Sequence, residues 1–259
     1  MKPTNIILDL LRTYLSRGSS VRNIMRTGAM FGFSENLMRV SLSRLAAKGT
    51  VENFKRGYYR LTNSTDHMND FIEEWRLGDA RRRDWHRNWV LAQGDSDSWA
   101  LNACGFFYLD KQLWVRPDNL TRSAEALQTL LENLGASSGC IIATDASLSL
   151  SREKTALERV ALNTLQNKYA ETIIKLKESL ARLNVIPTDA AQKECFYLGG
   201  TAIQVLALDP LLPEEIQPGD DRRSLWTLML EYDQVGRAIW RDKSGESPIT
   251  LPTAQVSTG

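Results

Sequence analysis

Histidine and cysteine, which build most zinc sites and disulfide frameworks, are scarce in this sequence. Two histidines and three cysteines occur among 259 residues. Cys104, Cys140 and Cys195 form no CxxC motif, and an odd count does not suit a disulfide framework, so we expect buried, reduced thiols. His67 and His86 have no second His or Cys at ligand spacing, so we expect no metal site and no cofactor.

Long apolar runs are also absent. No stretch approaches the ~18 residues that a membrane-spanning helix needs. The apolar stretch MKPTNIILDLLRTYL is interrupted by Asn5, Asp9 and Arg12, and no small-residue cleavage site follows it, so we do not interpret it as a signal peptide. Apolar residues make up 42% and charged residues 24% of the chain, which is typical of a globular protein. We therefore expect a cytoplasmic protein without a membrane partner.

The net charge of +1 conceals a division between the N-terminal residues and the rest of the chain. Residues 1–65 contain 11 Lys and Arg against 3 Asp and Glu, about +8, whereas the remaining residues contain 21 against 28, about −7. A strongly basic module joined to an acidic body indicates a polyanionic partner for the module.

Residues 1–62 have the element order of a winged helix-turn-helix. Apolar residues at helical spacing predict helices over 5–15 and 21–30. A third helix is expected to begin after Ser34, a typical N-cap, and to end before Gly49, a typical C-terminal cap. The segments TVENF and YYRLT follow as the two strands of a wing.

The two sides of the third helix differ in chemistry when they are phased at 100° per residue. Met38, Leu42 and Leu45 share one side, which should pack on the first two helices. The opposite side is short, polar and basic, as a major groove requires, because Asn pairs with adenine, Arg with guanine or phosphate, and Val contacts the thymine methyl group. Together with the wing, it gives the predicted DNA-binding residues, which are Ser34, Asn36, Arg39, Val40, Ser43, Arg44, Lys55, Arg56, Tyr58 and Arg60.

Short apolar strands alternate with helices in the middle of the chain. Strands are expected over residues 84–93, 105–117 and 139–146, with a helix over 122–134 before the last of them. With a short helix after the first strand, this order suggests a ferredoxin-like domain.

We therefore predict an α+β protein of three domains. They are a winged helix-turn-helix domain (1–63), a ferredoxin-like middle domain (85–150) and a helical C-terminal domain for dimerisation (151–245), and a linker (64–84) joins the first two. The last is expected to contain one long helix over 151–184 and further helices over 189–208 and 221–239. The tail, 243–259, is expected to be disordered or loosely packed.

Three segments in order resemble the PaaX family, bacterial repressors of phenylacetic acid catabolism. They are FGFSENLMRVSLSRLAAKG…GYYRLT, DWHRNWVLA followed by LWVRPDNL, and DPLLPEEI. The resemblance implies the three-domain fold above, binding of double-stranded operator DNA as a homodimer, and release from DNA by an acyl-coenzyme A effector, in the best-known branch phenylacetyl-coenzyme A. It implies no enzyme activity.

The sequence departs from the family pattern at three places. Trp226 arrives later after DPLLPEEI than is usual, and the middle domain is trimmed between Gln93 and Phe106; both differences bear on the effector. Val40 replaces a common threonine in the third helix, which suggests a different operator sequence.

The effector candidates combine cations and aromatic rings. A charged run could hold the phosphates of coenzyme A or could be a solvated linker. In DWHRNWV, alternation would place Trp85 and Trp89 on one face of a strand with Arg87 beside them, a wall that suits an aromatic acyl thioester or a domain interface. The candidates are Arg81, Arg82, Arg83, Trp85, Arg87, Trp89, Trp114 and Arg116.

Several alternatives remain open. Arg39 and Arg44 could be solvated helix charges, or Arg44 could bond internally to fix the wing. The middle domain also looks like that of small metal-dependent nucleases, in which Asp95 or Asp97 would hold the metal, although two aspartates in such a loop more often make a turn. A thioesterase is a third possibility, but the chain has no GxSxG motif.

Overall fold

The structure is a computed structural model that describes residues 2–14, 18–95, 98–137, 139–161 and 165–244. These residues form an α+β protein with two antiparallel sheets, as predicted. They group into two compact units: Met1–Asn69 with Ser179–Gly199 and Glu231–Gly259, and Asp70–Glu178 with Gly200–Leu230. Almost all of the tail for which we expected no regular structure lies outside the described residues.

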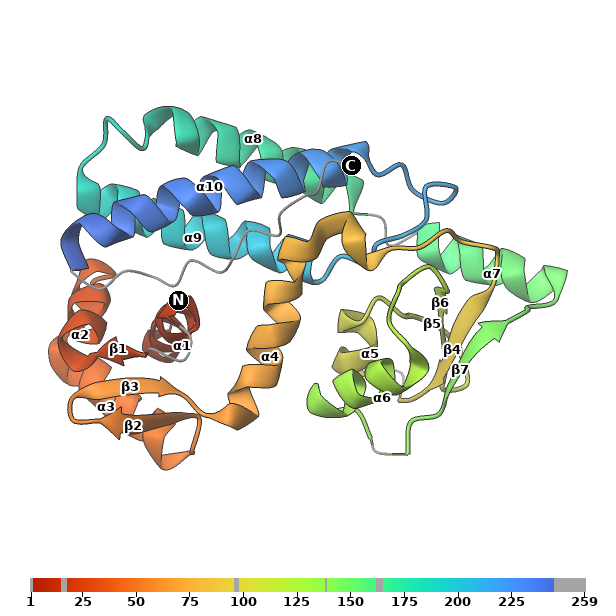
Figure 1. Cartoon of the computed structure of the whole chain (residues 1–259), viewed down its shortest axis with the longest axis horizontal. Helices are drawn as coiled ribbons and strands as arrows, with labels where there is room; N and C mark the ends of the chain where they lie inside the picture. Colours follow the sequence, from red (N-terminus) through yellow and green to blue (C-terminus); the bar gives the residue numbers. More distant parts are fainter. Residues whose placement is uncertain (1, 15–17, 96–97, 138, 162–164, 245–259) are drawn as a thin grey trace, which may run out of the picture. The chain divides into compact units, whose positions relative to one another are not determined.

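The N-terminal part of the first unit has the predicted three helices followed by a hairpin, with an additional short strand between the first two helices (Figure 1). Its helices are α1 (Pro3–Tyr14), α2 (Val21–Met30) and α3 (Glu35–Ala47), and its strands are β1 (Ser19–Ser20), β2 (Val51–Lys55) and β3 (Tyr58–Leu61). The strands form a small sheet in the order β1-β3-β2. The apolar face of α1 is fully buried, with α2 and α3 packed against it.

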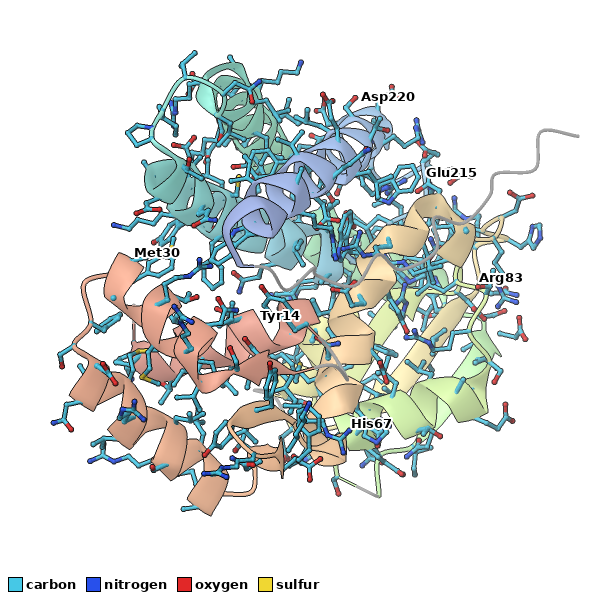
Figure 2. The ribbon with its side chains drawn as sticks, turned by 60° about the vertical axis from the view of Figure 1, so that its left-hand side comes forward. Tyr14, Met30, His67, Arg83, Glu215 and Asp220 are labelled. Atoms are coloured by element: carbon cyan, nitrogen blue, oxygen red, sulfur yellow. The ribbon has the colours of Figure 1, made fainter. Side chains whose placement is uncertain are left out.

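A buried asparagine joins the first two helices to the short strand between them. The side-chain amide of Asn23 donates to the Ser19 hydroxyl at 2.9 Å and to the Tyr14 hydroxyl at 3.3 Å. Tyr14 and Met30 mark the C-terminal ends of α1 and α2 in Figure 2. Because an unpaired buried amide is costly, this network fixes how the two helices meet.

Parts of the C-terminal helices belong to the first unit. These helices are α8 (Gln166–Arg182), α9 (Thr188–Ala207) and α10 (Asp220–Ser244), as predicted for the last two. Within the unit, the Ser179 and Tyr232 hydroxyls lie 2.9 Å apart. The amide of Gln192, on α9, donates to the Ile239 carbonyl of α10 at 3.2 Å. The ends of the three helices are therefore tied together by buried polar contacts.

The second unit contains the ferredoxin-like order of elements that the sequence predicts. Its sheet has the order β5-β6-β4-β7. The elements of this order are β4 (Trp89–Gln93), α5 (Trp99–Ala103), β5 (Phe107–Asp110), β6 (Leu113–Pro117), α6 (Ala124–Asn133) and β7 (Ile142–Ala146). They are preceded by α4 (Asn63–Glu73, largely of the first unit) and by the 3₁₀ helix η2 (Glu74–Arg81), and they are followed by α7 (Leu150–Ala161). Strand, helix, two strands, helix and strand give this antiparallel arrangement.

Three local predictions for this region are wrong. Residues 105–117 form a hairpin of two strands, because Lys111 and Gln112 adopt positive φ angles of 43° and 69° and turn the chain. Residues 84–88 are not part of a strand; β4 begins at Trp89. The long helix over 151–184 is two helices, α7 and α8, whose connection at 162–164 lies outside the described residues. Apolar periodicity alone does not distinguish one helix from two that pack on different partners.

Candidate nucleic-acid interface

The outward face of α3 is exposed, as its phase predicts. The face consists of Asn36, Arg39, Val40, Ser43, Arg44 and Ala47, all of them exposed. Met38, Leu42 and Leu45 on the other side are buried in the core of the unit. The Ser34 hydroxyl caps α3 by accepting from the Leu37 backbone N–H at 3.3 Å, and Gly49 leaves the helix with φ of 69°. The helix is thus held from behind and presents a polar, basic surface.

The two arginines of this face have different surroundings. The guanidinium of Arg39 donates to a Glu35 carboxylate oxygen one turn earlier, at 2.5 and 2.9 Å. Arg44 has no hydrogen bond or ion pair among the described residues. Among the described residues, Arg44 therefore makes no internal bond that could fix the wing, and it is available to a partner. Arg39, by contrast, must share Glu35 with a partner or leave it.

The β2–β3 hairpin carries the remaining predicted DNA-binding cations. Arg56, at its tip, is exposed. Lys55 Nζ lies 5.2 Å from the Tyr58 ring centre, a cation–π contact that orients the ammonium along the hairpin. Arg60 Nε donates to Glu52 at 2.7 Å, and its guanidinium lies over the Phe54 ring at 4.8 Å. Arg60 is therefore half-buried and bound to side chains of β2, whereas Arg56 is exposed.

Trp85, Arg87 and Trp89 lie close together in the second unit, but they are not aligned along one face of a strand, as we had expected. Residues 85–88 are irregular, with a bend at Arg87, where φ is 62°, and Trp85 Nε1 donates to the Asn88 carbonyl at 2.7 Å. The Trp85 and Trp89 rings meet edge to face at 5.7 Å. Arg87 lies 5.8 Å from the Trp85 ring, and it also pairs with Glu153 at 2.8 Å. Both rings are buried in the core with Val160, so little of their surface is open to a ligand.

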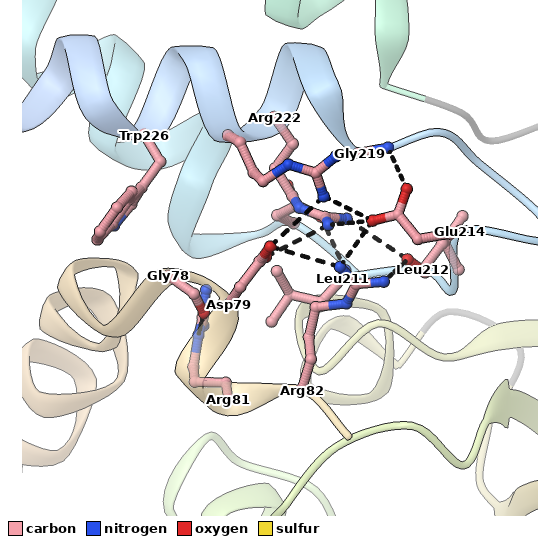
Figure 3. Close-up of polar contacts among 12 residues, drawn as sticks. Gly78, Asp79, Arg81, Arg82, Leu211, Leu212, Glu214, Gly219, Arg222 and Trp226 are labelled. Carbon is pink, nitrogen blue, oxygen red and sulfur yellow. Dashed lines mark hydrogen bonds and ion pairs between the residues drawn. The ribbon is translucent and has the colours of Figure 1, made fainter. Parts of the chain in front are cut away.

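The charged run Arg81–Arg83 is not a solvated linker. Arg82 donates to Glu214 at 3.0 Å and to the Leu212 carbonyl at 3.1 Å, and Arg83 pairs with the buried carboxylate of Asp118. Arg81 donates to the Gly78 carbonyl, and burial lowers its pKa from the ordinary value. Figure 3 shows that the contacts of Arg82 join the end of η2 to the loop before α10.

Two further effector candidates are structural. Arg116 is only 4% exposed and donates to the carbonyls of Cys104, Pro117 and Pro210. Burial, the largest cause, lowers the pKa of Arg116 to about 10. Trp114 is buried and donates from Nε1 to the Asp95 carbonyl at 3.1 Å. These contacts brace the sheet against its neighbours and leave neither side chain free to receive a ligand.

Sequence reasoning missed the buried polar centre that the DPLLPEEI segment forms. Asp209 is buried, accepts from the Tyr169 hydroxyl at 2.8 Å and from the Leu211 N–H at 2.7 Å, and has a pKa that burial raises. Asn119 donates to the Leu211 carbonyl at 2.6 Å. The DPLLPEEI segment could have revealed this centre, because an aspartate that precedes proline in an apolar segment is expected to be buried and to need polar partners. Tyr169, which falls within the single helix predicted over 151–184, lies near the start of α8.

The described part of the chain has neither a cluster of metal ligands nor a membrane-spanning helix. No group of three or more His, Cys, Asp and Glu that could hold a metal occurs there. Asp95 uses its carbonyl to accept from Trp114 and from the Ser98 N–H, as in a turn, and Asp97 lies outside the described residues. No described helix is long and apolar enough to cross a membrane. The three cysteines are buried and free, as predicted.

These features define an α+β protein whose basic N-terminal module exposes one polar helix face. Residues 2–65, the same module, match the family described as "PaaX-like protein", which confirms the resemblance over that quarter of the chain and indicates a regulator of transcription. No curated protein matches the chain.

One solved structure extends the likeness of fold to nearly the whole chain. It is "Uncharacterized protein Rv0674 from Mycobacterium tuberculosis", with a TM-score of 0.54 and 18% sequence identity. The alignment covers 92% of this chain and 99% of that one. At this identity the likeness concerns the fold alone.

Proposed function

We propose that this chain is a transcriptional repressor that binds operator DNA through an N-terminal winged helix-turn-helix. The observation that carries the proposal is the exposed face of α3, which is polar, basic and held rigidly by a buried apolar face behind it. A basic hairpin follows it directly, and the match to the PaaX-like family falls on the same residues. A module with this charge favours a polyanionic partner.

The α3 face supplies groups for reading bases in the major groove. In this proposal Asn36 pairs with adenine, Arg44 pairs with guanine or a phosphate, and Val40 contacts a thymine methyl group. Ser43 donates to either base type. Arg39 leaves Glu35 or shares it when a phosphate approaches, since an exposed ion pair one helical turn apart is worth only about 0.3–0.5 kcal/mol.

The hairpin acts as a wing that binds the backbone. Lys55 and Arg56 contact phosphates, and Tyr58 lies beside Lys55 at the same surface. Arg60 stays with Glu52 and supports the wing. Ser34 keeps its capping role, and its neighbouring N–H groups at the start of α3 lie where a helix N-terminus favours a phosphate.

A homodimer would place two α3 helices in successive major grooves, about 34–36 Å apart, and would block transcription from the site it covers. An acyl-coenzyme A effector, phenylacetyl-coenzyme A or a related thioester, would release the DNA by binding better to a form with unsuitable spacing. Among the effector candidates, Arg83 and Arg87 have the most exposed guanidinium groups, so they are the best placed to reach phosphates.

The test is fluorescence anisotropy with a labelled fragment from upstream of the protein's own gene. A scrambled fragment of equal length and composition is the control, and each is titrated at two salt concentrations. We expect tight binding to the promoter fragment alone, with affinity that falls steeply between about 50 and 200 mM salt. Equal affinity for both fragments would contradict operator binding.

The same complex is then titrated with phenylacetyl-coenzyme A, free phenylacetate and free coenzyme A. Release by the thioester alone supports both the repressor and its effector. Tight binding that none of the three disturbs would keep the repressor and exclude this effector.

A further inference from the structure

Three aromatic rings from distant parts of the sequence lie in a row in the first unit. The rings of Phe31 and Phe196 are 5.2 Å apart at 56°, and those of Phe196 and Trp240 are 6.2 Å apart at 47°. Both arrangements are within the range in which aromatic pairs attract beyond the area they bury. Phe31 is the C-cap residue that directly follows α2, whereas Phe196 and Trp240 come from α9 and α10.

The row ends inside the core of the N-terminal module. Trp240 is 8% exposed and belongs to the same buried cluster as the apolar residues of α1, α2 and α3, and Phe31 and Phe196 pack against that cluster. The C-terminal helices therefore contribute two large side chains to the core behind the candidate DNA-binding face.

Polar contacts hold the helices that carry Phe196 and Trp240. Gln192, one helical turn before Phe196, is buried and donates to the carbonyl of Ile239, the residue before Trp240. Glu194 of α9 pairs with Arg182 of α8 at 3.0 Å. The helices that carry the two rings, α9 and α10, are thus joined by a hydrogen bond, and α9 is also held to α8 by an ion pair.

Phe31 is the residue through which this support reaches α3. Its N–H donates to the Gly28 carbonyl at 3.1 Å, and the N–H of Phe33 donates to the same carbonyl at 3.0 Å. Gly32 between them has φ of 82°, which turns the chain into α3. A ring held at position 31 therefore fixes the turn that sets the start of the candidate recognition helix.

We infer that Phe196 and Trp240 are positioning residues for α3: they hold the α2–α3 turn at Phe31, so that the readiness of the DNA-binding face depends on the C-terminal helices. This inference rests on the proposed function for its meaning in DNA binding, although the positioning itself can be measured without DNA. Simple core packing predicts instead a loss of stability spread over the whole first unit.

The experiment is amide hydrogen exchange on the full chain, without DNA, for wild type and Phe196→Ala. We expect exchange to rise about tenfold or more in residues 28–38, while strands β4 and β6 of the second unit are unchanged. Phe196→Leu keeps apolar bulk and should raise exchange less, and it decides the question if Phe196→Ala does not fold. Tyr197→Ala removes a neighbouring, 59% exposed ring and is the matched control, with wild-type exchange expected.

The DNA arm uses the same variants in the anisotropy titration. We expect the ratio of operator to scrambled-DNA affinity to fall about tenfold in Phe196→Ala, while the salt dependence persists because every cation of α3 and the wing remains. Unchanged exchange in residues 28–38, or an equal rise throughout the first unit, overturns the inference. Selective exchange together with a wild-type protein that does not distinguish the two fragments would overturn the proposed function and leave the positioning role standing.

Discussion

Gly28 of α2 lies directly against Met38 of α3. A Cβ atom at position 28 would fall 2.4 Å from the Cγ and 2.6 Å from the Sδ of Met38. Met38 is fully buried, so its side chain has no solvent into which it could move. The missing side chain at position 28 therefore sets the spacing between the helix that supports the candidate interface and the helix that forms it.

Gly28→Ala is expected to lower the free energy of unfolding by about 1 kcal/mol. Overpacking a buried site costs about 1–3 kcal/mol, which exceeds the gain of about 1 kcal/mol from alanine in a helix. Gly200→Ala is the matched control, because Gly200 lies in α9 with nothing near its Cβ position, and it should stabilise the protein. Urea denaturation measures both. A Gly28→Ala variant as stable as wild type would show that α2 and α3 separate easily.

Arg44→Ala and Arg56→Ala should weaken DNA binding in different ways. Arg44 lies on the outward face of α3, so its loss should lower operator affinity by about 1–3 kcal/mol and relax specificity. Arg56 lies at the tip of the hairpin, so its loss should weaken binding to every sequence and reduce the salt slope by about 1. Titrations on operator and scrambled DNA at several salt concentrations separate the two. Identical losses for both variants on both fragments would contradict the assigned roles.

Glu35→Gln should strengthen DNA binding about two- to fivefold. The change frees the guanidinium of Arg39 from its ion pair and removes a negative charge from the surface that meets phosphates. Glu158→Gln, an exposed residue of α7 in the second unit, changes the net charge equally and should leave affinity as it is. Anisotropy at low salt measures the difference. Equal effects of the two variants would assign the gain to overall charge.

The first unit follows closely from local sequence signals. The caps at Ser34 and Gly49 and the phase of Met38, Leu42 and Leu45 predicted α3 and its two faces, because each depends on residues within one or two helical turns. The contribution of Phe196 and Trp240 to the same core could not be predicted in this way, since nothing local reveals a packing partner about 160–200 residues away in the chain.

Two errors in the second unit have a common physical origin. Turns there depend on backbone angles that Arg87, Lys111 and Gln112 rarely adopt, so none of them gave the signal that Gly or Asn would have given. Charge was equally ambiguous. Arginines such as Arg82 and Arg116 are typical of phosphate sites, but both side chains are largely buried and donate to the carbonyls of residues far away in the sequence, so their role is structural. The predicted domain boundaries, the dimer and the effector contacts stay predictions.

Glu214 makes the stability of the second unit dependent on pH. Burial raises the pKa of this carboxyl, but hydrogen bonds from Arg223, the Gly219 N–H and Arg82 outweigh that effect and hold the pKa at about 2. Since the folded-state pKa is below the ordinary value of 4.5, the stabilisation is complete above pH 4.5 and is lost as the pH falls toward about 2. The carboxyl is half exposed, so solvent screening keeps the effect small.

Glu214→Gln should therefore lower stability at pH 7 by about 1 kcal/mol or less and flatten the fall in stability between pH 4.5 and 2. Glu215→Gln, its exposed neighbour, is the control and should keep the wild-type profile, because Arg82, Arg222 and Arg223 pair with Glu214 and not with Glu215. Urea denaturation at a series of pH values measures the three proteins. If Glu214→Gln keeps the wild-type slope, the contacts of Glu214 with Arg82 and Arg223 do not stabilise the loop before α10.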